Sequence, residues 1–117
     1  MPRRDVRMYL VDLLAACDAA TAAVASCTEE EFRTTRLFRA AAERELSIIG
    51  EAVNQMLKQE PELASRITDA REIIHVRNLL IHAYDLVNPR IVRNIVLDDI
   101  PILRAEVAAL LSERAGS

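Results

Sequence analysis

Helix-breaking residues are scarce in this chain. It contains only two glycines and four prolines in 117 residues, and these two residue types are the strongest local interrupters of regular structure. Hydrophobic residues make up 51% of the chain but aromatic residues only 3%, which predicts a core built from Leu, Ile, Val and Ala. A chain of this length suits one domain with one core. We therefore predict an all-α fold in a single domain, residues 1–117.

Apolar residues recur at helical spacing along most of the chain. The pattern predicts helices over residues 5–25, over residues 35–58, from Thr68 or Asp69 to about residue 81, and from Asn88-Pro89 onward. Residues 28–31, Thr-Glu-Glu-Glu, form a capping-box sequence that opens either a short turn or the second helix. Pro101 either kinks the last helix or starts a new one. The expected architecture is an antiparallel bundle of four to five helices.

Two features of these helices carry predictions about packing. Gly50 lies in the middle of the second helix, where glycine costs about 1 kcal/mol relative to alanine. We therefore expect another helix to cross closely at Gly50. The third helix carries Ile73, Val76, Leu80 and Ile81, and is apolar on most sides. This pattern predicts that it is the most buried helix.

Charge and cysteine content restrict the class of protein. The formal net charge is −3, which disfavours a protein that binds long nucleic acids over a broad basic surface. Cys17 and Cys27 would lie about 15 Å apart along one helix, too far for a disulfide. Asp12 interrupts the first apolar run, so we predict neither a signal peptide nor a membrane span. A cytoplasmic protein with reduced cysteines is expected.

Residues 77–84, Arg-Asn-Leu-Leu-Ile-His-Ala-Tyr, concentrate unusual polar chemistry in an apolar helix. Arg77, Asn78, His82 and Tyr84 need partners or a cleft, because burying them unpaired costs several kcal/mol. Arg77 and His82 lie about 140° apart around a straight helix, so they do not share a face. Either the helix ends near Ile81 and a turn returns His82 toward Arg77, or the same motif of a second chain completes the site across a two-fold axis.

Other interpretations of these residues remain open. In the plainest of them, Arg77 pairs with an acidic residue at the edge of the core, and His82 bonds to the backbone where the helix ends. Glu51 is a candidate partner for Arg77 or Arg71. His75, seven residues before His82, is too far from it to share one zinc ion without further ligands, so no metal site is predicted.

The spacing Arg77-x4-His82-x-Tyr84 resembles the signature of the HepT-like toxins, a branch of the HEPN ribonuclease superfamily. Residues 48–52, residues 71–74 and residues 97–103 extend this resemblance, which covers the chain from about Phe32 to the C-terminus. It implies a helical bundle of HEPN type, a homodimer with both motifs facing one cleft, and a metal-independent endoribonuclease that needs no cofactor. It also implies a nucleotidyltransferase antitoxin as partner, which transfers AMP to the motif tyrosine, here Tyr84. The assembly with this antitoxin is expected to hold the homodimer or a higher oligomer.

The chemistry of these side chains suits such a reaction. Histidine is suited to proton transfer near neutral pH, so His82 can act as general base or acid on the ribose 2′-OH. Arg77 can stabilise charge on the phosphoryl oxygens through its fixed fork of donors, and Asn78 can hold a phosphate oxygen or orient His82. The alternative is a non-catalytic helical module that binds a nucleotide or the nucleotidyltransferase. The acidic net charge and the scarcity of aromatic residues for base stacking favour that alternative slightly.

Overall fold

The computed structural model describes residues 4–115, and every regular element among them is helical. The six α-helices are α1 (Val6–Ala25), α2 (Glu29–Thr34), α3 (Arg36–Gln59), α4 (Ala70–His82), α5 (Pro89–Asn94) and α6 (Ile100–Ala115). Two 3₁₀ segments, η1 (Pro61–Arg66) and η2 (Tyr84–Leu86), and one π-helical segment, η3 (Ile95–Asp99), connect them. The predicted all-α class is confirmed.

Local side-chain caps start three of these helices where the sequence predicts them. The Asp5 carboxylate accepts from the Arg7 amide at 2.9 Å, and the Asn88 side chain accepts from the Arg90 amide at 2.8 Å. Thr28 and Glu31 form a complete capping box, which opens α2 as a separate short helix. These caps satisfy amide groups that have no partner within the helix.

The α4 start differs from the prediction in its chemistry. Asp69 occupies the N-cap position, but its side chain makes no capping hydrogen bond. Its backbone is left-handed, with φ of 55°. The preceding Thr68 amide donates instead to the Glu106 carboxylate of α6, at 3.1 Å to each oxygen. The start of α4 is therefore held by a tertiary contact that no local pattern reveals.

The C-terminal run explains why there are six α-helices rather than four to five. Helices α5 and α6 are continuous through η3, where the Ile100 amide donates to the Ile95 carbonyl, five residues back. Pro101 follows directly and has no amide hydrogen to donate to the carbonyl of Leu97. The sequence predicted a kink or a new helix at Pro101, and the structure has a π-helical turn just before this residue. With α2 as an additional short helix, the count rises to six.

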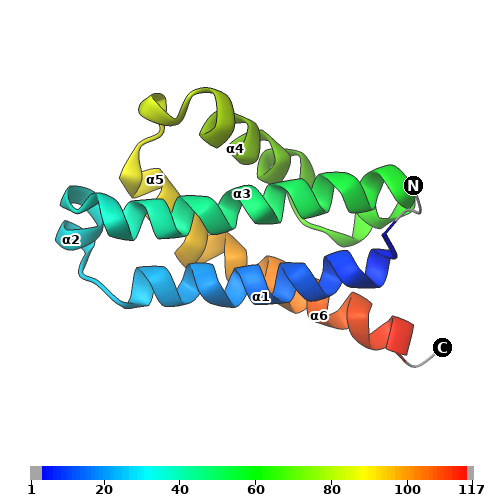
Figure 1. The fold of residues 1–117 in the computed structure, drawn as a ribbon. Coiled ribbons are helices and arrows are strands. Elements are labelled where there is room, and N and C mark those ends of the chain that lie inside the picture. Colours follow the sequence, from blue (N-terminus) through cyan, green and yellow to red (C-terminus); the bar gives the residue numbers. More distant parts are fainter. Residues whose placement is uncertain (1–3, 116–117) are drawn as a thin grey trace.

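The core is aliphatic and lies mainly between α1, α3 and α6. Figure 1 shows α1 and α3 running antiparallel beside each other, with α5 and α6 crossing behind them. At its centre lie four fully buried side chains, Leu10, Leu13, Val53 and Val107. By length and composition α1 could also cross a membrane, but here it packs as a core helix.

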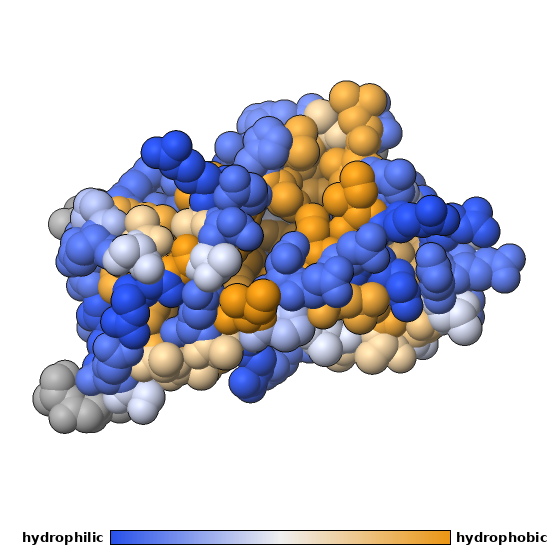
Figure 2. Space-filling model, turned by 180° about the vertical axis from the view of Figure 1, so that it is seen from behind, coloured by the Kyte–Doolittle hydropathy of each residue, from blue (hydrophilic) through white to orange (hydrophobic). Residues whose placement is uncertain are grey.

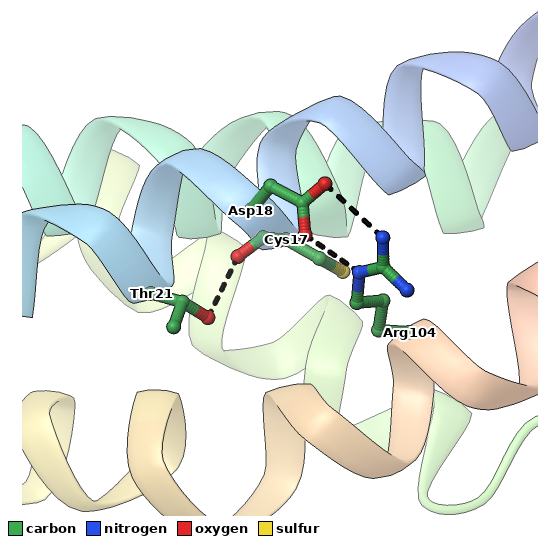
Figure 3. A network of polar contacts seen from close by, with 4 residues as sticks. All are labelled: Cys17, Asp18, Thr21 and Arg104. Carbon is green, nitrogen blue, oxygen red and sulfur yellow. Dashed lines mark hydrogen bonds and ion pairs between the residues drawn. The ribbon is translucent and has the colours of Figure 1, made fainter.

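A polar clamp joins α1 to α6 at the edge of this core (Figure 3). The Arg104 guanidinium donates to both carboxylate oxygens of Asp18, at 2.6 and 3.3 Å, and this pairing lowers the pKa of Asp18. Beside it, burial raises the pKa of the Cys17 thiol to about 12. Cys17 and Cys27 are both free thiols. At neutral pH Cys17 is protonated, so it acts as a small packed side chain rather than a nucleophile.

The prediction that α4 is the most buried helix is wrong. Only Ala70 and Leu80 of α4 are buried, whereas Leu79 is 37% and Ile81 48% exposed. The reason is that α4 packs along α3 and leaves a hollow between itself and the η3–α6 run. Hydrophobic side chains surround this hollow on the face seen in Figure 2. The apolar pattern of α4 therefore includes side chains that this single chain leaves in solvent.

Candidate active site

The centre of the candidate site is the crossing of α3 and α4. A Cβ atom placed on Gly50 would lie 2.2 Å from Cβ of Arg77 and 3.1 Å from the carbonyl oxygen of Ile73. Real Cβ atoms do not approach so closely, so only glycine permits this crossing. The close contact predicted at Gly50 is confirmed, and it places the base of the Arg77 side chain directly against α3.

Two polar contacts fix the far end of Arg77. Its Nη2 atom lies 2.7 Å from Oε2 of Glu51, and its Nη1 atom donates to Oδ1 of Asn78 at 2.8 Å. The Arg77 side chain is only 25% exposed, and its Nε–H group is buried without a hydrogen-bond partner among the described residues. The expected partner Glu51 is therefore confirmed. An arginine held between an acid and an amide keeps one orientation with some donors still available.

Arg77 and Glu51 line a shallow surface pocket of about 320 Å³. Ile48 of α3 and Ile81 of α4 form apolar walls, and α1 contributes Tyr9. The part from α1 was not anticipated from the sequence, because neither the motif nor the resemblance reaches the first helix. The pocket thus draws on three helices that only the tertiary fold brings together.

His82 does not return toward Arg77. Helix α4 continues through His82 and closes with the Ala83 amide donating to the Leu79 carbonyl at 2.7 Å. The first of the two predicted arrangements, a turn that swings His82 back, is wrong because the helix ends one residue too late. His82 is exposed, and its ring makes no hydrogen bond among the described residues. It follows Asn78 by one helical turn, so these two side chains are neighbours on the surface of α4.

Tyr84 begins η2, two residues beyond the end of α4. Because the helix stops at His82, Tyr84 does not continue the helical face of Arg77. The side chain of Tyr84 lies outside what the structure describes. The motif therefore spans three backbone environments: mid-helix for Arg77 and Asn78, helix end for His82, and 3₁₀ turn for Tyr84.

His75 lies on the exposed side of α4, on the same side as Asn78 and His82. Within residues 4–115, no group of three His, Cys, Asp or Glu side chains is arranged to hold a metal ion. The exposed polar side of α4 is therefore a row of His75, Asn78 and His82, with Arg77 at its inner edge.

A model of the protein family described as Ribonuclease HepT-like matches residues 13–110. The chain belongs to the HepT-like ribonuclease family. The match begins earlier than the resemblance from Phe32 and includes most of α1. An RNA-cleaving activity is the common property to which this family name refers.

Similar proteins carry names of the same kind. A "Putative RNase" of Caldanaerobacter subterraneus subsp. tengcongensis is 35% identical, over 92% of this chain and 95% of its own length. A "Putative RNase" of Methanocaldococcus jannaschii is 30% identical, over 92% of this chain and 97% of its own length. The "Gamma-glutamylcyclotransferase and putative RNase" of the same organism is 29% identical, and the match spans 95% of this chain but only 50% of that longer protein. No solved structure matches the chain significantly.

Proposed function

We propose that this HepT-like ribonuclease is the toxin of a toxin–antitoxin pair and cleaves RNA in the cytoplasm without a metal ion. The observation that carries the proposal is the fixed Arg77 guanidinium, held by Glu51 and Asn78 at the edge of a surface pocket, with His82 at the end of the same helix. These residues supply a cation and a general base, the two kinds of group needed for phosphodiester transfer.

The proposed reaction begins at the ribose 2′-OH next to the scissile phosphate. A neutral His82 accepts the 2′ proton while the 2′ oxygen attacks phosphorus, and the bond from phosphorus to the 5′ oxygen breaks. The leaving 5′ oxygen takes a proton from a protonated histidine. Arg77 donates to the phosphoryl oxygens as they gain charge, and Asn78 keeps Arg77 in place. The products are a 2′,3′-cyclic phosphate and a free 5′-hydroxyl.

We further propose that the working enzyme is a homodimer. Arg77 and His82 of one chain lie about 140° apart around α4, so one chain does not direct both at the same phosphate. Across a two-fold axis, Arg77 of one chain can meet His82 of the second, and the second histidine can protonate the leaving oxygen. The exposed apolar side chains of Leu79 and Ile81, at 37% and 48%, flank these residues and supply surface for such a contact.

The mechanism predicts which substrates and conditions support cleavage. An RNA oligonucleotide with a single 2′-deoxyribose at the cleavage position should resist, while the all-ribose oligonucleotide is cut equally well with and without EDTA. Gel analysis of end-labelled oligonucleotides and mass analysis of the new ends measure this directly. Cleavage at the deoxy position at the normal rate would exclude 2′-OH attack, and loss of activity in EDTA would exclude metal independence. No cleavage of any RNA would favour the non-catalytic binding module instead.

We propose that a small nucleotidyltransferase antitoxin silences the enzyme by transferring AMP to Tyr84. The motif position of Tyr84, just beyond His82, supports this, because a nucleotide there adds bulk and negative charge that repel substrate phosphate. Co-expression with the cognate nucleotidyltransferase, alone or in a larger assembly, should increase the intact mass by whole AMP units and stop RNA cleavage. The Tyr84→Phe variant should gain no mass and stay active. Unchanged mass in the wild type, or an equal gain in Tyr84→Phe, would refute this assignment.

A further inference from the structure

A second cleft lies beside the candidate site, at the end of the molecule where α3 begins and α4 ends. Figure 1 shows the first turns of α3, the segment after α4 and α5 meeting at this end. The cleft measures about 580 Å³, and its lining includes Arg36, Arg39 and Arg44 of α3. The opposite wall comes from Leu80 and the segment around Asp85. Three arginines therefore share one cleft in a protein whose net charge is −3.

None of these three arginines forms an ion pair within residues 4–115. The ion pairs among the described residues involve Arg4, Arg66, Arg77, Arg104 and Arg114. Within the same part of the chain, Arg36 and Arg44 make neither an ion pair nor a side-chain hydrogen bond, and Arg39 donates only to the Arg33 carbonyl, at 3.4 Å. Their guanidinium groups are thus available to an incoming anion.

The cleft adjoins the Arg77 pocket. Ser47 lines both hollows, so they meet on the surface of α3. Along the axis of α3, Arg44 lies about 10 Å and Arg36 about 22 Å from Glu51, the partner of Arg77. The arginines therefore form a path that starts near the candidate active site and leads away from it. A linear polyanion that reaches Arg77 can follow this path.

Two acidic residues, Glu43 and Asp85, line the same cleft. Burial raises the pKa of the Glu43 carboxyl, and the nearby Arg39 and Arg36 act against this shift. A carboxylate among the arginines weakens anion binding, so its removal should have the opposite effect to the removal of an arginine. Removing the Glu43 carboxylate should therefore strengthen anion binding, a result that would not be expected if the cleft residues only stabilised the fold.

We propose that the cleft of Arg36, Arg39 and Arg44 binds the phosphates of the RNA substrate that flank the scissile bond. Arginine matches phosphate geometry with two parallel donors, and unpaired arginines in a row give a backbone-tracking surface without base readout. This inference rests on the proposed ribonuclease function. It explains how a protein of acidic net charge can hold a polyanion, since the basic groups are concentrated beside the site.

Binding is measured with a fluorescein-labelled 2′-O-methyl RNA of about 12 nucleotides, within the range of single-strand site sizes, which cannot be cleaved through 2′-OH attack. The test variant is Arg36→Gln/Arg44→Gln. The control Arg66→Gln/Arg104→Gln removes the same charge from surface ion pairs elsewhere. We expect the test variant to bind roughly tenfold more weakly near 0.1 M salt, with a salt slope shallower by about 1.4. The control should stay within about twofold, and Glu43→Gln should bind about twofold more tightly.

Three results would contradict the proposed role of the cleft in RNA binding. They are equally weakened RNA binding in the test and control variants, unchanged RNA binding in the test variant, and no RNA binding by the wild type. A parallel assay with a dinucleotide substrate separates this inference from the proposed function. The dinucleotide is too short to reach Arg36, so the test variant should cleave it at the wild-type rate. Loss of dinucleotide cleavage in the test variant also contradicts the cleft, because its arginines would then act at the reacting phosphate. A wild type that cleaves neither the dinucleotide nor a longer all-ribose RNA refutes the proposed function, whereas intact cleavage with RNA binding that does not depend on the arginines refutes only the proposed role of the cleft.

Discussion

Replacing His82 by alanine is expected to lower the rate of RNA cleavage by roughly 10²–10⁴-fold, because the reaction loses its proton acceptor. Arg77→Ala is expected to cost roughly 10²–10³-fold through the loss of charge stabilisation at the phosphoryl oxygens. The two losses should not add in the double variant, since both groups serve one transition state. Single-turnover cleavage of an end-labelled RNA measures all three rates.

The matched control for these variants is His75→Ala. His75 is exposed on the same helix and the same side as His82, so its removal takes away an imidazole without touching the Arg77 contacts. Its rate should stay within about twofold of the wild type, as is usual for surface substitutions. If His75→Ala were as damaging as His82→Ala, or if His82→Ala kept full activity, the assignment of the histidine would be wrong.

Gly50→Ala should destabilise the protein and impair cleavage together. Alanine would gain about 1 kcal/mol in helix propensity, but its Cβ would meet Cβ of Arg77 at 2.2 Å. The clash involves atoms close to both backbones, so α3 and α4 must separate. Overpacking of this kind costs about 1–3 kcal/mol, and a shift of about 1 Å in Arg77 can lower the rate by about 10²-fold. Urea denaturation and cleavage rates on the folded protein measure both effects.

A reciprocal variant tests the steric origin of this effect. In the Arg77→Gly background the opposing Cβ is absent, so Gly50→Ala should cost much less free energy of unfolding there than in the wild type. The coupling between the two positions is the expected signature of a contact. A Gly50→Ala protein that is as stable and as active as the wild type would contradict the crossing, and equal destabilisation in both backgrounds would remove Arg77 as its cause.

How far the sequence predicts this molecule depends on how local the responsible interactions are. The starts at Asp5, Thr28 and Asn88 are set by side chains a few residues away, so they could be predicted. The start at Asp69 depends on Glu106, a residue 38 positions from Thr68, and could not. The apolar pattern of α4 correctly indicated a helix but not its partial exposure, because periodicity does not reveal which neighbours cover each face.

The same distinction applies to the site. The motif identified Arg77, Asn78, His82 and Tyr84 as chemically unusual, and helix geometry showed that Arg77 and His82 diverge. The orientation of Arg77 toward Glu51 follows from the α3–α4 crossing, for which Gly50 was the only local sign. The arginine cleft is harder to predict from the sequence. Helical spacing places Arg36, Arg39 and Arg44 on one side of α3, but only the fold shows that they have no ion-pair partners among the described residues.

The central claim is that Arg77 of one chain acts with His82 of a second. The most direct test is a heterodimer of one Arg77→Ala chain and one His82→Ala chain, co-expressed with different affinity tags and purified through both. One of its two composite sites retains Arg77 of one chain and His82 of the other but lacks the second histidine, so the heterodimer should be clearly more active than either homodimeric variant while remaining below half of the wild-type activity. A heterodimer no more active than the homodimers would contradict a site shared between two chains.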